Sequence, residues 1–114
     1  MSNETVKTIS GKVSYAVKMA LPRNSTLQVR LLDVSLQDVL AKELAAQITA
    51  NAEKPDGLNF NLTYKLADVL PGHTYAISAS ITHEDRLLFA TTQPHQVELG
   101  VDYVNEQEVW VSLV

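Results

Sequence analysis

The most regular segment of the chain reads Leu58-Asn59-Phe60-Asn61-Leu62-Thr63-Tyr64-Lys65-Leu66. Apolar and polar residues alternate throughout it. This period of two is typical of a β-strand with one face in the core and the other in water. The preceding Lys54-Pro55-Asp56-Gly57 has proline and glycine where a type I turn favours them. The two segments together predict a turn followed by a half-buried strand.

The same alternation recurs along the chain and predicts further strands. It covers residues 9–19, 26–36, 75–81, 87–92 and 109–113. His83-Glu84-Asp85-Arg86 is the predicted tip of the hairpin that joins 75–81 to 87–92. The adjacent Leu31-Leu32 changes which alternate positions are apolar, so we expect a β-bulge or a strand that changes sheets there.

Residues 37–50 fit two structures. Leu40, Leu44 and Ile48 lie on one helical stripe, and Ala, Glu, Lys and Gln in this segment are good helix formers. Leu44 and Ile48 also alternate with Ala46 and Ala50 as in a strand, and an all-β neighbourhood can override local propensity. The prediction is a short turn or helical piece around Asp38 to Lys42, followed by a strand.

A tyrosine follows a turn in Leu70-Pro71-Gly72-His73-Thr74-Tyr75. This arrangement is that of a tyrosine corner, in which a buried tyrosine hydroxyl bonds backbone a few residues upstream. Together with about seven to eight short strands separated by turn signals, it predicts an all-β fold. The expected architecture is a single Ig-like Greek-key β-sandwich over residues 1–114, with 1–6 flexible.

Composition excludes several classes of function. The 114 residues suit one domain, and the net charge of −4, with nine dispersed Lys and Arg residues, gives no basic surface for nucleic acid. There is no basic amphipathic helix and no apolar run long enough to span a bilayer, so direct membrane insertion is not expected. Cysteine is absent, which excludes disulfides and thiolate metal sites.

Candidate catalytic and metal-binding residues are few and scattered. His73, His83 and His95 lack a second ligand at metal-site spacing, and we expect each to be exposed in or beside a turn. Asp33 is the one carboxylate that the alternation of its strand places inward. We favour a structural explanation over a catalytic one: either a bulge turns Asp33 to solvent, or its side chain accepts a hydrogen bond from a neighbouring backbone N–H group. The other carboxylates considered as acid/base groups are Asp38, Glu84, Asp85 and Glu98. No nucleophile or phosphate-loop motif is present, so we predict no enzyme activity, cofactor or metal.

Trp110 is the candidate interface residue. If Val109, Val111 and Leu113 point into the core, Trp110 points outward beside Glu108 and Ser112. Tryptophan is over-represented among binding hot spots. We therefore expect Trp110 to be at least partly exposed and to take part in partner binding or self-association. The alternative is that the N-terminal segment or a loop covers its ring.

Five segments of the chain together form a recognisable pattern. They are Ile9-Ser10-Gly11-Lys12-Val13-Ser14-Tyr15, Ala20-Leu21-Pro22, Val29-Arg30-Leu31-Leu32-Asp33-Val34-Ser35, the Leu70 to Tyr75 turn and Asp85-Arg86-Leu87-Leu88-Phe89. In this order they resemble the YbaY/YscW family of small bacterial envelope proteins. The resemblance covers roughly residues 9–92. It implies a β-sandwich without catalytic activity, in a family of lipoproteins and type III secretion lipoprotein chaperones (pilotins).

The predicted function is a non-enzymatic protein-interaction domain of bacterial envelope type, whose partner is an unidentified envelope or secretion component. The alternative is a carrier that holds a small apolar ligand between the sheets. A closed core favours the first, and an empty apolar cavity favours the second. Family members usually carry a signal with a lipidated cysteine, which this sequence lacks. Two locations follow: cytoplasmic as the sequence stands, or periplasmic or anchored to the outer membrane if a leader was trimmed.

Overall fold

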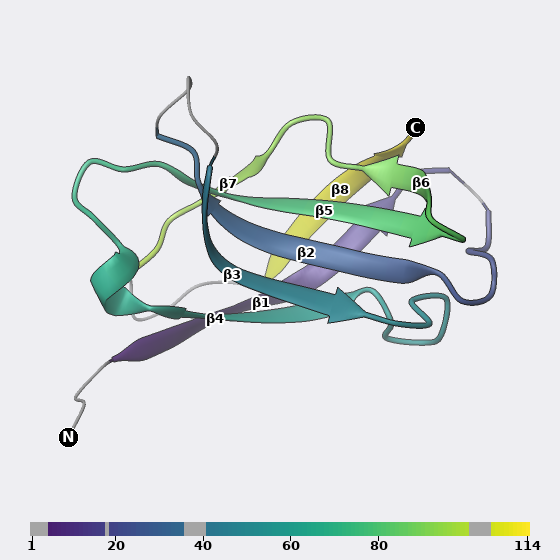
Figure 1. Cartoon of the computed structure of the whole chain (residues 1–114), viewed down its shortest axis with the longest axis horizontal. Helices are drawn as coiled ribbons and strands as arrows, with labels where there is room; N and C mark the ends of the chain where they lie inside the picture. Colours follow the sequence, from purple (N-terminus) through teal and green to yellow (C-terminus); the bar gives the residue numbers. More distant parts are fainter. Residues whose placement is uncertain (1–4, 18, 36–40, 101–105) are drawn as a thin grey trace.

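The computed structural model describes residues 5–17, 19–35, 41–100 and 106–114 (Figure 1). These residues form eight strands and one short 3₁₀ turn. The elements are β1 (Val6–Tyr15), β2 (Thr26–Asp33), β3 (Lys42–Thr49), β4 (Asn59–Lys65), η1 (Leu66–Asp68), β5 (Tyr75–His83), β6 (Arg86–Ala90), β7 (His95–Val97) and β8 (Gln107–Leu113).

All eight strands belong to one curled sheet. Its order is β3-β2-β5-β6-β8-β1-β4, with β7 paired to β5. Paired strands are antiparallel, except that β1 and β8 run parallel. The two edge strands, β3 and β4, lie side by side (Figure 1), and the Gln47 side chain of β3 accepts a hydrogen bond from the Asn61 N–H of β4 at 2.8 Å. The described residues therefore form a nearly closed barrel with one seam.

Alternation places one face of each long strand in a single core. In β4, Phe60, Leu62 and Tyr64 are buried while the residues between them are exposed. The largest fully buried side chains include Phe89 of β6 and Ile77 and Ile81 of β5. One contiguous cluster joins residues from β1, β2, β4, β5, β6 and β8. The space between the two halves of the sheet is therefore occupied by the protein's own side chains.

The prediction of an all-β fold with seven to eight strands is confirmed. The pairing does not confirm an Ig-like Greek-key sandwich, because β6 and β8 hydrogen-bond through Phe89↔Leu113 and Ala90↔Ser112 and so join both halves into one sheet. That finer architecture stays a prediction.

Several predicted boundaries need correction. The first strand begins at Val6 and not at Ile9, because Val6 already pairs with Lys65, and beside this pair Thr5 O accepts the Leu66 N–H at 2.9 Å. The first strand ends at Tyr15 and not at Met19, because the chain bends back and the Tyr15 hydroxyl donates to Met19 O at 2.8 Å. The short strand β7 has no counterpart among the predicted strands.

The ambiguous segment 37–50 contains a strand, because Lys42–Thr49 pairs antiparallel with β2 as β3. The predicted helical piece begins at Asp38, which lies outside the described residues. The irregularity predicted at Leu31-Leu32 is confirmed: Leu31 pairs with Ala45 but Leu32 pairs with Glu43. The unpaired extra residue is thus Leu44 of β3, while the pairing of β2 with β5 stays regular.

Candidate functional site

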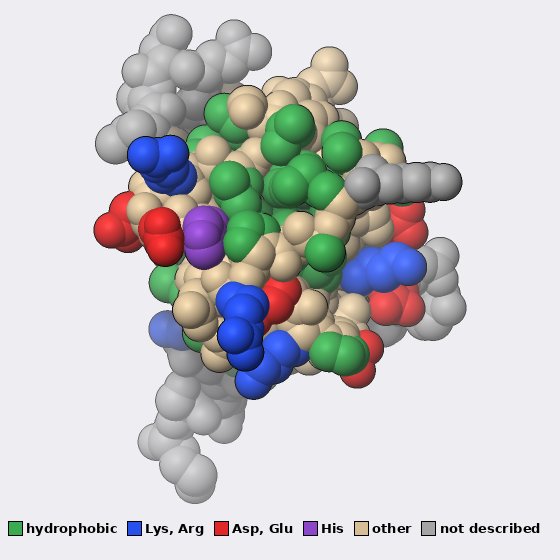
Figure 2. All heavy atoms as spheres, turned by 90° about the vertical axis from the view of Figure 1, so that its right-hand side faces the viewer, with side chains coloured by type: hydrophobic (Ala, Val, Ile, Leu, Met, Phe, Trp, Pro, Cys, Tyr) green, Lys and Arg blue, Asp and Glu red, His purple; other side chains and the backbone are tan. Residues whose placement is uncertain are grey.

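Large apolar side chains are exposed at one end of the barrel. The apolar rim, as we name it, consists of side chains that are 40% to 74% exposed, namely Val17, Met19, Leu87, Leu113 and Val114. Figure 2 views the end of the molecule that lies on the right of Figure 1, and hydrophobic side chains gather there around a shallow hollow. Monomeric proteins rarely expose large contiguous apolar patches without a function.

Contacts with the core hold the segments of the rim together. The Tyr15 ring packs on Phe89 with centroids 4.7 Å apart, and its hydroxyl fixes the loop at Met19. The Val114 N–H donates to Leu88 O at 2.9 Å, which fastens the last described residue to β6. A groove of about 520 Å³ adjoins Tyr15 and Leu21. The rim is therefore a positioned surface next to a depression.

Trp110 lies on the outward face of β8. Its side chain is 55% exposed, whereas Val109 and Val111 on either side are buried. A groove of about 370 Å³ separates the ring from the 92–96 segment and is lined by polar side chains and Pro94. Leu113, predicted to point into the core, is instead 54% exposed because it lies at the open end of the barrel.

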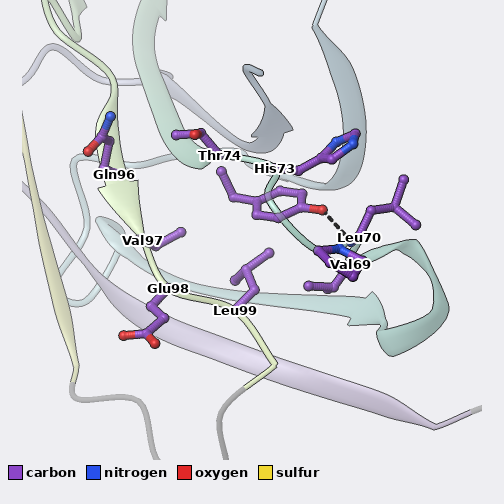
Figure 3. A pocket seen from close by; sticks show the side chains of 10 residues that line it. Val69, Leu70, His73, Thr74, Gln96, Val97, Glu98 and Leu99 are labelled. Atoms are coloured by element: carbon purple, nitrogen blue, oxygen red, sulfur yellow. Dashed lines mark hydrogen bonds between the residues drawn. The ribbon is translucent and has the colours of Figure 1, made fainter. Parts of the chain in front are cut away.

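Tyr75, the first residue of β5, lines a third groove (Figure 3). Its ring is 4% exposed, and its hydroxyl accepts the Leu70 N–H at 2.7 Å. The groove has a volume of about 640 Å³. Its other lining side chains, apolar and polar, come from the segment between η1 and β5, from β7 and from the two residues after β7. They are Val69, Leu70, Pro71, His73, Thr74, Gln96, Val97, Glu98 and Leu99.

Asp33 and His73 form the only ion pair of the described residues in which a carboxylate is largely buried. Asp33 Oδ2 lies 2.6 Å from His73 Nδ1, and its Oδ1 accepts the Ser35 N–H at 3.0 Å. The Asp33 side chain is 12% exposed. Burial alone would raise the pKa of Asp33, but the hydrogen bonds from His73 and Ser35 and the His73 charge outweigh it and lower the pKa from 3.8 to about 2. Asp33 therefore fastens the end of β2 to the 70–75 turn.

This lowered pKa predicts a loss of stability in acid. Because the folded-state pKa lies below the unfolded one, the contribution is present above about pH 4 and is lost as the pH falls toward 2. We expect about 1–2 kcal/mol, after allowance for the partial exposure of His73. Urea unfolding of the parent and of Asp33→Asn between pH 6 and pH 2 measures it. A stability difference that does not shrink over this range would contradict the assignment.

The remaining predicted residues are not brought together. Asp38 lies outside the described residues, and Glu84 and Asp85 are exposed in the β5–β6 turn. His83 and His95 are partly buried rather than exposed: His83 Nδ1 is buried without a hydrogen-bond partner, and His95 Nε2 lies 2.8 Å from Gln107 Oε1. Among residues 5–17, 19–35, 41–100 and 106–114, no three His, Asp or Glu residues form a potential metal site.

An all-β domain with an exposed tryptophan and an apolar rim is typical of binding domains. Comparison with known proteins identifies the family to which this chain belongs. The chain belongs to the family described as type III secretion system lipoprotein chaperone (YscW), whose pattern matches residues 4–109. The resemblance seen in the sequence is thereby confirmed.

Two relatives illustrate the family. The uncharacterized lipoprotein YbaY of Escherichia coli (strain K12) is 39% identical over 83 residues, which are 73% of this chain and 44% of that protein. The chain thus spans less than half the length of this relative. The structure of an alternative pilotin from the type II secretion system of Vibrio cholerae has a TM-score of 0.80 and 32% identity and covers 96% of each chain. The family is one of envelope lipoproteins and secretion chaperones. No helix in the described part of this chain is long and apolar enough to cross a membrane.

Proposed function

We propose that this chain is a non-enzymatic interaction domain that binds a segment of a protein partner through the apolar rim and Trp110. The observation that carries the proposal is the exposure of these large apolar side chains, with Trp110 at 55% and Val114 at 74%. Burying them against a partner would remove apolar surface from water and so favour association. Trp110 belongs to the same strand as Leu113 of the rim, and an exposed indole has the properties of an interface anchor.

The proposed partner is a component of the bacterial envelope or of a secretion system. This follows from the family, because its members are described as lipoprotein chaperones and the similar solved structure is a pilotin. The proposed location is the periplasm or the periplasmic surface of the outer membrane. It rests on the lipoprotein relatives.

The alternative function, a carrier that holds a small apolar ligand between the sheets, is opposed by the filled core. A ligand between the two halves of the sheet would have to displace side chains of the core cluster, among them the fully buried Leu27, Phe89 and Val109. The Tyr75 groove is open to solvent at the surface instead. The filled core favours the interaction domain.

Trp110→Ala tests the proposal. We expect the affinity for the partner to fall about 30-fold, as for a hot-spot residue, while the free energy of unfolding changes by less than about 0.5 kcal/mol. The partner is first isolated by affinity capture from the native organism with the full genomic reading frame, and is then titrated against both proteins. Acrylamide quenching of the single tryptophan reports its exposure in the free protein.

Ile48→Ala is the matched control, because Ile48 is a large apolar residue that is 69% exposed on β3. It should leave the affinity for the partner unchanged. The proposed site would be refuted if Trp110→Ala bound the partner as tightly as the parent does. It would also be refuted if Trp110→Ala lost much of its stability.

A further inference from the structure

The seam between β3 and β4 is the one place where two described neighbouring strands are joined without a backbone ladder. β3 and β4 are the two ends of the strand order. A single side-chain amide spans them: Gln47 Oε1 accepts the Asn61 N–H at 2.8 Å, and Gln47 Nε2 donates to Asn59 O at 3.4 Å. Farther along the seam, Lys42 Nζ and Asp68 Oδ1 are 3.9 Å apart. Gln47 thus supplies the donor and acceptor that a neighbouring strand would offer.

The edge of β4 has more backbone groups than Gln47 can satisfy. Alternate residues of an antiparallel edge strand direct both N–H and C=O outward. Asn61 is such a residue, since its N–H bonds Gln47, and Thr63, two residues later, faces the same way. Within the described residues, no group of β3 hydrogen-bonds the Thr63 backbone. An edge of this kind is a template for pairing with another strand.

β3 is the long strand held least firmly in the core. None of its residues is fully buried, whereas β4 buries Phe60, Leu62 and Tyr64. The unpaired Leu44 also interrupts its ladder with β2. Elements with few buried contacts open most readily. β3 can therefore be displaced at lower cost than β4, and the edge of β4 then becomes accessible.

We propose that the edge of β4, Asn59–Lys65, is a second binding site, which accepts an extended segment of a protein partner as an added strand. The Gln47 side chain occupies this edge in the free protein and is displaced on binding. Backbone groups of the added strand pair with Asn61 and Thr63, as in β-augmentation. Apolar residues at alternate positions of the segment lie beside Leu62 and Tyr64. This site is separate from the apolar rim and does not depend on it.

Titration of the isotope-labelled full chain by NMR tests the site. The probe is a short synthetic peptide of alternating valine and threonine flanked by lysines. At millimolar concentration it should shift the amide resonances of Asn61 and Thr63 most strongly. Gln47→Ala removes the internal competitor and should tighten binding about fivefold. Gln28→Ala, which changes an exposed glutamine on the outer face of β2, should leave binding unchanged.

Two further comparisons distinguish strand addition at β4 from peptide binding elsewhere on the protein. An added strand pairs through one edge only, so a probe N-methylated on every threonine and a probe N-methylated on every valine should differ, with one losing binding. Trp110→Ala should bind the peptide as tightly as the parent does. A result against the apolar rim as a binding site would therefore not count against the site at the edge of β4. Shifts confined to other strands, or Gln47→Ala binding no tighter than the parent, would overturn the proposal.

Discussion

Gly11→Ala should destabilise the fold by about 3 kcal/mol or more. Gly11 lies where β1 is paired on both sides, with Phe60 of β4 and with Gln107 of β8. A Cβ atom at this position would be 2.1 Å from Gln107 O and 2.8 Å from its carbonyl carbon. Both are backbone atoms, so no side-chain rotation relieves the clash and β8 has to move. Urea unfolding followed by circular dichroism measures the loss.

Lys12→Ala is the control for this substitution, because it changes the neighbouring residue on the exposed face of β1. Lys12 Nζ and Glu108 Oε2 are 3.9 Å apart, and both side chains are about half exposed, so the pair contributes little. Its free energy of unfolding should stay within about 0.5 kcal/mol of the parent. A Gly11→Ala protein as stable as Lys12→Ala would mean that β1 and β8 do not approach each other as described.

Tyr75→Phe should cost about 1–3 kcal/mol, because it removes one oxygen from a buried hydrogen bond. The hydroxyl accepts the Leu70 N–H at 2.7 Å and lies 3.4 Å from Asp68 O. With the ring 4% exposed, a phenylalanine would leave the Leu70 N–H without this acceptor. The unfolding midpoint in urea measures the effect.

Tyr15→Phe provides the comparison, because it removes a hydroxyl that bonds Met19 O at a more exposed position. It should cost less than Tyr75→Phe, since water can replace the lost bond. A Tyr75→Phe midpoint indistinguishable from that of the parent would show that Tyr75 is not a corner residue.

Strands with strict alternation could be predicted from the sequence, and the edge strand could not. β4 alternates without exception, and the structure buries the apolar residues that its pattern selects. β3 is rich in Ala, Glu, Lys and Gln and has no fully buried residue, so its local preferences are helical and its strand form depends on pairing with β2. The bulge could be predicted because the alternate positions that are apolar change at Leu31-Leu32. Its extra residue, however, is Leu44 of the partner strand β3.

Side chains that meet across long stretches of sequence could not be foreseen. Asp33 and His73 are 40 residues apart, and Gln47 and Asn61 are 14 apart. Neither pair has a spacing signal. Asp33 and His73 meet because the end of β2 pairs with the start of β5, and Gln47 and Asn61 meet because the sheet curls until its two edge strands lie side by side. Trp110 was identifiable since its neighbours Val109 and Val111 reveal the face of the strand. The apolar rim could not be recognised from alternation. In the predicted strands 9–19 and 109–113, alternation assigns Val17, Met19 and Leu113 of the rim to buried positions.

Site-specific photo-cross-linking tests the proposed interaction surface most directly. A photoreactive phenylalanine analogue is placed at position 110 and, in a separate protein, at position 48, where the replaced Ile48 is 69% exposed on β3. Both proteins are expressed in the native organism and irradiated, and cross-linked partners are identified by mass spectrometry. We predict that position 110 cross-links a defined envelope or secretion protein in high yield and that position 48 does not cross-link that protein. Equal cross-linking of the same protein from both positions, or none from position 110, would contradict the assignment of Trp110 and the apolar rim as the binding surface.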